Sequence, residues 1–206
     1  MTAKTQGRAA VRLERTIPAT PHQVYRAWLE PELLRRWMAP GGLEVTRAEV
    51  DGRPGGAFRI WHADAGAEIG GFECELLELV PDRRIMFRWG FVGPDRADGP
   101  CYDSLLTVTL REAPDGGTVL TLVRERLDAL AAAMPQVAEN VGPGWESALG
   151  KLAAVAQRYG LWVACPILSS PLSARARRSL PRWRRSAPSA RRRPATWCLR
   201  RGAPGR

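Results

Sequence analysis

A series of runs in which apolar and polar residues alternate, joined by short connections, constrains the fold of this chain more than any other feature. Alternation with a period of two is typical of a half-buried β-strand. Short connections join consecutive strands in an antiparallel arrangement. We therefore predict an antiparallel sheet of six to seven strands. The first run is Val11–Ile17, and the runs that short connections join are Leu43–Val50, Ala57–His62, Glu68–Leu79, Arg84–Phe91, Tyr102–Arg111 and Thr118–Arg126.

Two short helices are predicted directly after the first run. Thr20 suits an N-cap, Pro21 the first helical position, and Gln23 completes a capping box. This helix is expected to end near Glu30 and Pro31, and a second one to span Glu32–Trp37. In the strand Glu68–Leu79 the alternation slips by one residue, which predicts a β-bulge at Leu76 and Leu77.

A long helix is predicted to end the folded part, over Trp145–Tyr159, with Gly160 as its C-cap. Trp145, Leu149, Leu152 and Ala156 recur at helical spacing and form one apolar stripe. The helix spans about 24 Å, and an eight-residue strand spans about 26 Å. The helix is therefore long enough to cover one face of the whole sheet.

The charge of the chain is concentrated at its end. The whole sequence carries a formal charge of +10, but residues 161–206 hold 12 Arg and no acidic residue. The preceding 160 residues are close to neutral, which argues against specific nucleic-acid binding by that part. We predict one domain over 1–160. The segment 161–206, rich in Arg, Pro and Ser, is predicted to be a disordered tail, and its Arg clusters could bind anionic polymers nonspecifically.

Several other classes are disfavoured by composition. No apolar stretch is long enough to span a bilayer, and the first 15 residues show no secretory signal. The four cysteines form no CxxC pair, so neither a disulfide framework nor a metal site is expected. Reduced thiols favour a cytoplasmic location. No phosphate-binding glycine loop is found, and we predict no cofactor and no metal.

Five segments in one linear order are similar to a known family pattern. They are Trp28 with Leu33-Leu34-Arg-Arg-Trp37-Met-Ala-Pro40, the turn Gly52-Arg-Pro-Gly-Gly56-Ala-Phe58, the hairpin Phe72 to Trp89, the strand Gly117-Thr118-Val-Leu-Thr-Leu122, and the helix Gly144-Trp145-Glu-Ser-Ala-Leu149-Gly-Lys-Leu152. Together they resemble the AHSA1-like branch of the START/SRPBCC superfamily, the Bet v 1-like helix-grip proteins. The resemblance covers about residues 9–160, and Leu127 to Val141 departs from the pattern.

The resemblance implies an α+β helix-grip fold, a curved antiparallel sheet around the long C-terminal helix with a cavity between them. Bulky aromatic residues on the strands, opposite small residues on the helix, favour such a cavity on physical grounds. An alternative is that the aromatic residues simply fill the core. The predicted pocket residues are Trp37, Phe58, Trp61, Phe72, Phe87, Trp89, Trp145 and Leu149.

Candidates for catalysis are scarce in this sequence. No catalytic residue is assigned, and His62 alone is a candidate general base, although a structural histidine is the more common role for such a residue. Several polar residues could reach the pocket, but solvent-facing roles suit them better. These residues are Glu73, Glu75, Arg88, Tyr102 and Asp103.

Three functions therefore remain open at the level of sequence. The first is a protein that binds a small hydrophobic molecule, and the scarcity of catalytic groups favours it. The resemblance also implies two alternatives: a cyclase- or dehydratase-like enzyme acting on an apolar, polyketide-like substrate, and a co-chaperone-like interaction domain. A homodimer is a possible assembly. Fold analogy alone does not choose among these functions.

Overall fold

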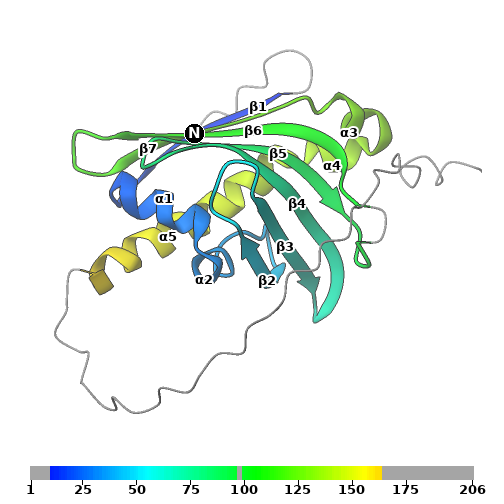
Figure 1. Ribbon diagram of the computed structural model, residues 1–206, viewed down its shortest axis with the longest axis horizontal. Helices are drawn as coiled ribbons and strands as arrows, with labels where there is room; N and C mark the ends of the chain where they lie inside the picture. Colours follow the sequence, from blue (N-terminus) through cyan, green and yellow to red (C-terminus); the bar gives the residue numbers. More distant parts are fainter. Residues whose placement is uncertain (1–9, 97–98, 164–206) are drawn as a thin grey trace, which may run out of the picture.

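The computed structural model describes residues 10–96 and 99–163, with the side chains of 159–163 left out. It has an α+β fold in which one curved antiparallel sheet lies over a long helix, α5 (Figure 1). The seven strands follow the order β1-β7-β6-β5-β4-β3-β2. Their bounds are β1 Val11–Ile17, β2 Glu44–Val50, β3 Ala57–Asp64, β4 Ala67–Val80, β5 Arg84–Val92, β6 Cys101–Glu112 and β7 Thr118–Glu125.

The predicted strands and their pairing are confirmed. Each strand from β2 to β7 pairs with its neighbour in the sequence, and β1 closes the order by pairing with β7. The bulge predicted in β4 is present, because the register with β5 shifts between Leu76 and Glu78. The extra residue keeps Leu76 and Leu79 on the side of the core despite the slip in alternation.

The first two helices follow the prediction closely. Helix α1, Pro21–Leu29, begins with the full capping box between Thr20 and Gln23. Helix α2 spans only Pro31–Leu34, so it is shorter than the predicted Glu32–Trp37. After it the chain continues in turns that bury Trp37, whose indole N–H donates to the Ala27 carbonyl at 2.9 Å.

The long helix differs from its prediction at both ends. Two short helices, α3 over Asp128–Ala133 and α4 over Pro135–Glu139, were not predicted and precede it. Helix α5 spans Val141–Val163, so Pro143 lies in its first turn, where a proline is tolerated. The helix also continues past Gly160, which is therefore not its C-cap. Its predicted apolar stripe is buried against the rest of the fold.

Glycines let the strands of the sheet approach one another closely where it bends. Gly70 in β4 has a φ of +111°, and a Cβ atom there would lie 2.2 Å from the carbonyl oxygen of Val92. At Gly71 a Cβ atom would lie 2.0 Å from the carbonyl oxygen of Ile60. Only glycine fits both positions. This end of β4 belongs to the part of the sheet that curves around the helices in Figure 1.

Polar contacts fasten α5 to the loop that follows α2. The Lys151 ammonium donates to the carbonyl oxygens of Ala39 and Gly41, both at 2.8 Å. The Gly41 N–H donates to the Ser147 hydroxyl at 3.0 Å. These bonds hold the loop, and with it Met38 and Pro40, against the helix.

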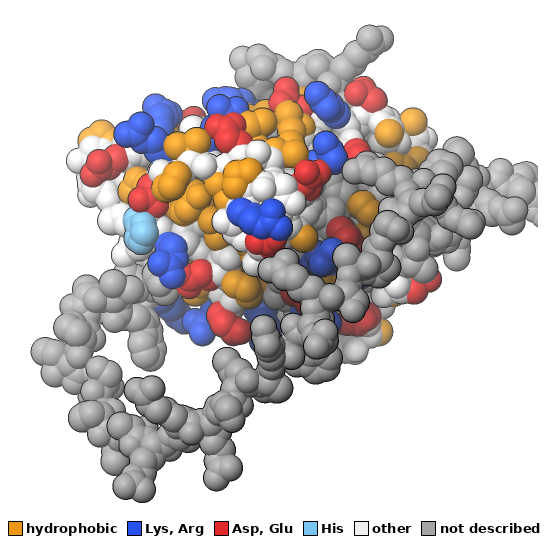
Figure 2. All heavy atoms as spheres, viewed as in Figure 1, with side chains coloured by type: hydrophobic (Ala, Val, Ile, Leu, Met, Phe, Trp, Pro, Cys, Tyr) orange, Lys and Arg blue, Asp and Glu red, His pale blue; other side chains and the backbone are white. Residues whose placement is uncertain are grey.

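The surface of the described part mixes both signs of charge. Figure 2 shows Lys and Arg side chains interspersed with Asp and Glu among hydrophobic ones on the visible face. None of the helices that the structure describes is long and apolar enough to cross a membrane. The predicted tail lies outside the described residues from 164 onward.

Candidate functional site

A cavity of about 190 Å³ lies between the sheet and the first turns of α5. The sheet contributes Phe72, Phe91 and Arg124, and α5 contributes Gly144, Trp145 and Ala148 among others. The mouth is formed by residues around α4, because Val137 and Asn140 are exposed whereas most of the lining is buried or half-buried. The full lining is Met38, Pro40, Phe72, Phe91, Arg124, Val137, Asn140, Val141, Gly144, Trp145 and Ala148.

Arg124 is the one charged residue of this lining, and it is only 2% exposed. It projects from β7, where its Nε donates to the Ser104 hydroxyl at 3.1 Å. The Ser104 hydroxyl in turn donates to the Trp89 carbonyl at 3.2 Å. The Nη2 of Arg124 is buried and has no hydrogen-bond partner.

The charge of Arg124 is therefore poorly compensated. No carboxylate among the described residues lies within salt-bridge distance of it. The guanidinium carbon lies 5.0 Å from the Phe91 ring centroid and 5.7 Å from that of Trp89, which gives a partial cation–π contact. Burial lowers the pKa of Arg124 to about 10, so the group stays charged at neutral pH. An isolated buried charge is costly to hold in a fold.

Two of the predicted pocket residues, Phe72 and Trp145, line the cavity. Five others are almost fully buried and belong to the core around it rather than to the lining: Trp37, Phe58, Phe87, Trp89 and Leu149. Trp89 connects the two groups, because its ring centroid lies 4.7 Å from that of Phe72 and 5.3 Å from that of Trp145. Aromatic side chains thus fill much of the interior, and the cavity that remains between the sheet and α5 is small.

Trp61 requires a correction, because the structure places it on the other face of the sheet. Alternation along β3 buries Phe58, Ile60 and His62 and turns Trp61 away from them. Its ring is covered by two guanidinium groups, with the carbon of Arg96 3.8 Å and that of Arg47 4.8 Å from the ring centroid. Trp61 therefore does not belong to the cavity.

His62 lies behind the wall of the cavity. It is 5% exposed, its Nε2 donates to the Met38 carbonyl at 2.8 Å, and its ring packs edge-on against Phe72 at 4.8 Å between centroids. Burial lowers the pKa of His62 below its ordinary value of 6.5, with a further lowering by the charge of Arg96. The ring contacts the lining residues Met38 and Phe72 but does not itself line the cavity.

The polar candidates point elsewhere. Glu75 pairs with Arg88 at 2.8 Å and Glu73 with Arg59 at 3.2 Å, across the outer face of the sheet. Asp103 is exposed, and neither it nor Tyr102 lines the cavity.

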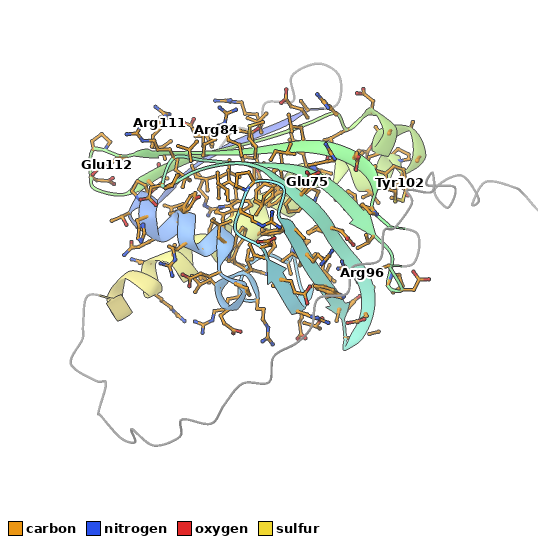
Figure 3. All side chains as sticks on the ribbon, viewed as in Figure 1. Glu75, Arg84, Arg96, Tyr102, Arg111 and Glu112 are labelled. Atoms are coloured by element: carbon orange, nitrogen blue, oxygen red, sulfur yellow. The ribbon has the colours of Figure 1, made fainter. Side chains whose placement is uncertain are left out.

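An open groove of about 770 Å³ lies at the opposite end of the sheet. Arg84, Arg111 and Glu112 line it, and Figure 3 shows them far from Tyr102, which lies toward the end of the sheet where the cavity is. The groove also contains an exposed pair, with His22 Nδ1 3.0 Å from an Asp82 carboxylate oxygen. Its charged and exposed lining suits solvent better than an apolar ligand.

No group of three or more metal-ligating side chains occurs in the described part of the chain.

The sequence prediction missed Arg124, although the strand that carries it was predicted. In β7 the residues Leu120, Leu122 and Arg124 share the buried face, so the arginine stands where the pattern requires an apolar residue. The alternation along β7, which places Arg124 on the inner face, was the feature of the sequence that could have identified it as a site residue. No comparable signal marked Met38, Pro40 and Asn140, which reach the cavity through loops.

Comparison with known proteins agrees with this architecture. The family model of the activator of Hsp90 ATPase homolog 1-like protein matches residues 18–157. The chain therefore belongs to this AHSA1-like family, which confirms the resemblance seen in the sequence. No curated protein matches it.

Solved structures with the same fold come from several bacteria. Protein CV1439 from Chromobacterium violaceum is 34% identical, with a TM-score of 0.59, over 72% of this chain and 97% of that one. Protein Ms6760 from Mycobacterium smegmatis is 22% identical, with a TM-score of 0.64, over 75% of this chain and 95% of that one. Protein NE0264 from Nitrosomonas europaea is 19% identical, with a TM-score of 0.61, over 76% and 99%. The latter two likenesses concern the fold alone.

Proposed function

We propose that this protein binds a small hydrophobic molecule in the cavity between the sheet and α5. The observation that carries the proposal is the lining, in which nine of the eleven residues are apolar or glycine and only Asn140 and Arg124 are polar. Burial of apolar ligand surface there contributes about 25 cal/mol per Å². The volume of about 190 Å³ is below the range of about 300–1,000 Å³ typical of drug-sized ligands. The expected ligand is correspondingly small.

We favour binding over catalysis because general acid–base chemistry needs titratable groups placed against the substrate. Arg124 supplies one fixed charge. His62 does not line the cavity, and its Nε2 proton is donated to the Met38 carbonyl. A cyclase-like activity would have to rely on positioning alone.

A protein-interaction role has less support on the surface. The large hydrophobic residues that are exposed in the described part are Ile69 and Val80, near opposite ends of β4, and Val137 on α4. A docking surface is expected to gather such residues in one patch. Val137 instead belongs to the mouth of the cavity.

Filling the cavity from α5 tests the proposal. Ala148 is 3% exposed and lines the cavity, so Ala148→Leu places three extra carbon atoms in it. Ala154 is exposed on the same helix, so Ala154→Leu is a matched control. We expect native mass spectrometry of the full chain, and tryptophan fluorescence titrated with small apolar compounds, to show binding to the wild type and to Ala154→Leu. Ala148→Leu should bind at least about tenfold more weakly while it remains folded.

Two results would contradict the proposal. One is a wild-type protein that carries no ligand and does not respond to any compound of the panel. The other is a folded Ala148→Leu variant whose affinities equal those of the wild type.

A further inference from the structure

Arg124 gives the cavity a chemical preference that its shape does not explain. A guanidinium on an inward-facing strand position displaces apolar packing and loses its hydration. Natural folds keep such a charge where it has a partner. Here the Nε is occupied by Ser104, while the buried Nη2 has no partner and no described carboxylate approaches. The unmet donor lies on a residue that lines a cavity.

The N-terminus of α5 adds positive potential at the same place. Val141 and Gly144 of its first turn line the cavity, and that turn contains no acidic residue. The N-terminal end of a helix carries partial positive charge and favours anions. In a helix of 23 residues the aligned peptide dipoles are numerous. Arg124 and the N-terminus of α5 are thus two separate sources of positive potential in the cavity.

We infer that the ligand of this cavity is an amphipathic monoanion, an apolar body with one carboxylate that accepts a hydrogen bond from Arg124. This inference rests on the proposed function, since it names the class of hydrophobic ligand. A single negative charge balances the single guanidinium. A doubly charged phosphate would leave one charge unpaired in an apolar site. The uncharged lining then holds the apolar body of the ligand.

A matched pair of ligands tests the carboxylate. We would measure binding of 3-phenylpropionate and its neutral amide, 3-phenylpropionamide, to the full chain by isothermal titration calorimetry. The expected result is that the wild type binds the acid at least about tenfold more tightly than the amide, because charge-assisted hydrogen bonds are stronger than neutral ones.

Substitutions at Arg124 assign the preference to that residue. Arg124→Met keeps most of the side-chain length and removes the charge, so it should bind acid and amide equally. Arg124→Lys keeps the charge and should retain part of the preference. Arg12 is exposed on β1, so Arg12→Met is the charge-matched control and should behave as the wild type. All variants share the basic residues of 161–206, so nonspecific attraction of anions is common to them.

The outcomes separate the two proposals. If the wild type binds the amide as tightly as the acid, the carboxylate inference fails while the binding function stands. If it binds neither these nor other small apolar compounds, both fail. An acid preference that persists in a folded Arg124→Met, or disappears equally in Arg12→Met, would also overturn the assignment to Arg124. If Arg124→Met does not fold, the wild-type comparison and Arg124→Lys still decide the matter.

Discussion

His62 shows how one buried side chain links the wall of the cavity to pH. Its Nε2 proton binds the Met38 carbonyl, and burial lowers its pKa below 6.5. Well above pH 6.5 the ring is neutral in both the folded and the unfolded chain, so it contributes no pH dependence there. Below that value the unfolded chain takes up a proton that the folded protein resists. The free energy of unfolding therefore falls as the pH drops from 6.5 toward the lowered pKa.

Replacing His62 with a residue that does not titrate should remove this contribution. We expect urea denaturation to show a larger loss of unfolding free energy between about pH 7.5 and about pH 5.5 for the wild type than for His62→Gln. Glutamine retains an N–H donor for Met38. Equal losses in the two proteins would show that His62 is not responsible.

The residue scale also shows where sequence reasoning stopped. Phe72 and Trp145 were predicted for the pocket and line it, because period-two and helical spacing place them on inward faces. Trp61 was included although its neighbour His62 already shared a face with Phe58, so it had to point outward. Arg124 was not among the predicted site residues, although it shares the buried face of β7 with Leu120 and Leu122. A charged residue at an otherwise apolar, inward-facing position of a strand was thus the most informative feature for the site.

At the scale of elements, attachment of α5 to the loop after α2 shapes the cavity. Lys151 donates two hydrogen bonds of 2.8 Å to Ala39 and Gly41, in the loop that supplies Met38 and Pro40 to the lining. We expect Lys151→Met to lower the free energy of unfolding by about 1–3 kcal/mol in chemical denaturation, since removal of the charged donor leaves the partly buried Ala39 carbonyl without this partner.

Arg158 provides the control for this substitution, because it is an exposed cation on the same helix. Arg158→Met should change the unfolding free energy by less than about 0.5 kcal/mol. Equal stability of the two variants would mean that the hydrogen bonds from Lys151 to the loop after α2 contribute nothing to the free energy of unfolding.

Strands were easier to predict than helix ends. Each strand follows from alternation and a short connection, and even the bulge of β4 was visible as a slip at Leu76. The helices α3 and α4 have no sustained apolar stripe, and only Leu130 is buried among their residues. Their position is set by packing against the rest of the fold, which local spacing does not report. The same is true of the cavity mouth that they border.

At the scale of the whole molecule, the fold is a sheet and a helix whose interior is mostly filled by aromatic rings. The rings of Trp28 and Trp145 lie 5.8 Å apart between centroids, which fastens α1 to α5. The cavity lies toward the N-terminal end of α5, beside Arg124. The sequence predicted a cavity between the sheet and the long helix, and the extent of that cavity depends on how the side chains interlock. The division into a domain over 1–160 and a tail stays a prediction.

Two tryptophans, one on α5 inside the fold and one on the outer face of the sheet, offer the most direct test of ligand binding in the cavity. Trp145 lines the cavity, whereas Trp61 lies outside under Arg96 and Arg47. We would titrate the ¹⁵N-labelled full chain with 3-phenylpropionate and follow the indole N–H resonances by NMR. The account predicts that the Trp145 resonance shifts in a saturable manner while that of Trp61 stays in place. A shift at Trp61 alone, or no saturable shift at Trp145, would contradict it.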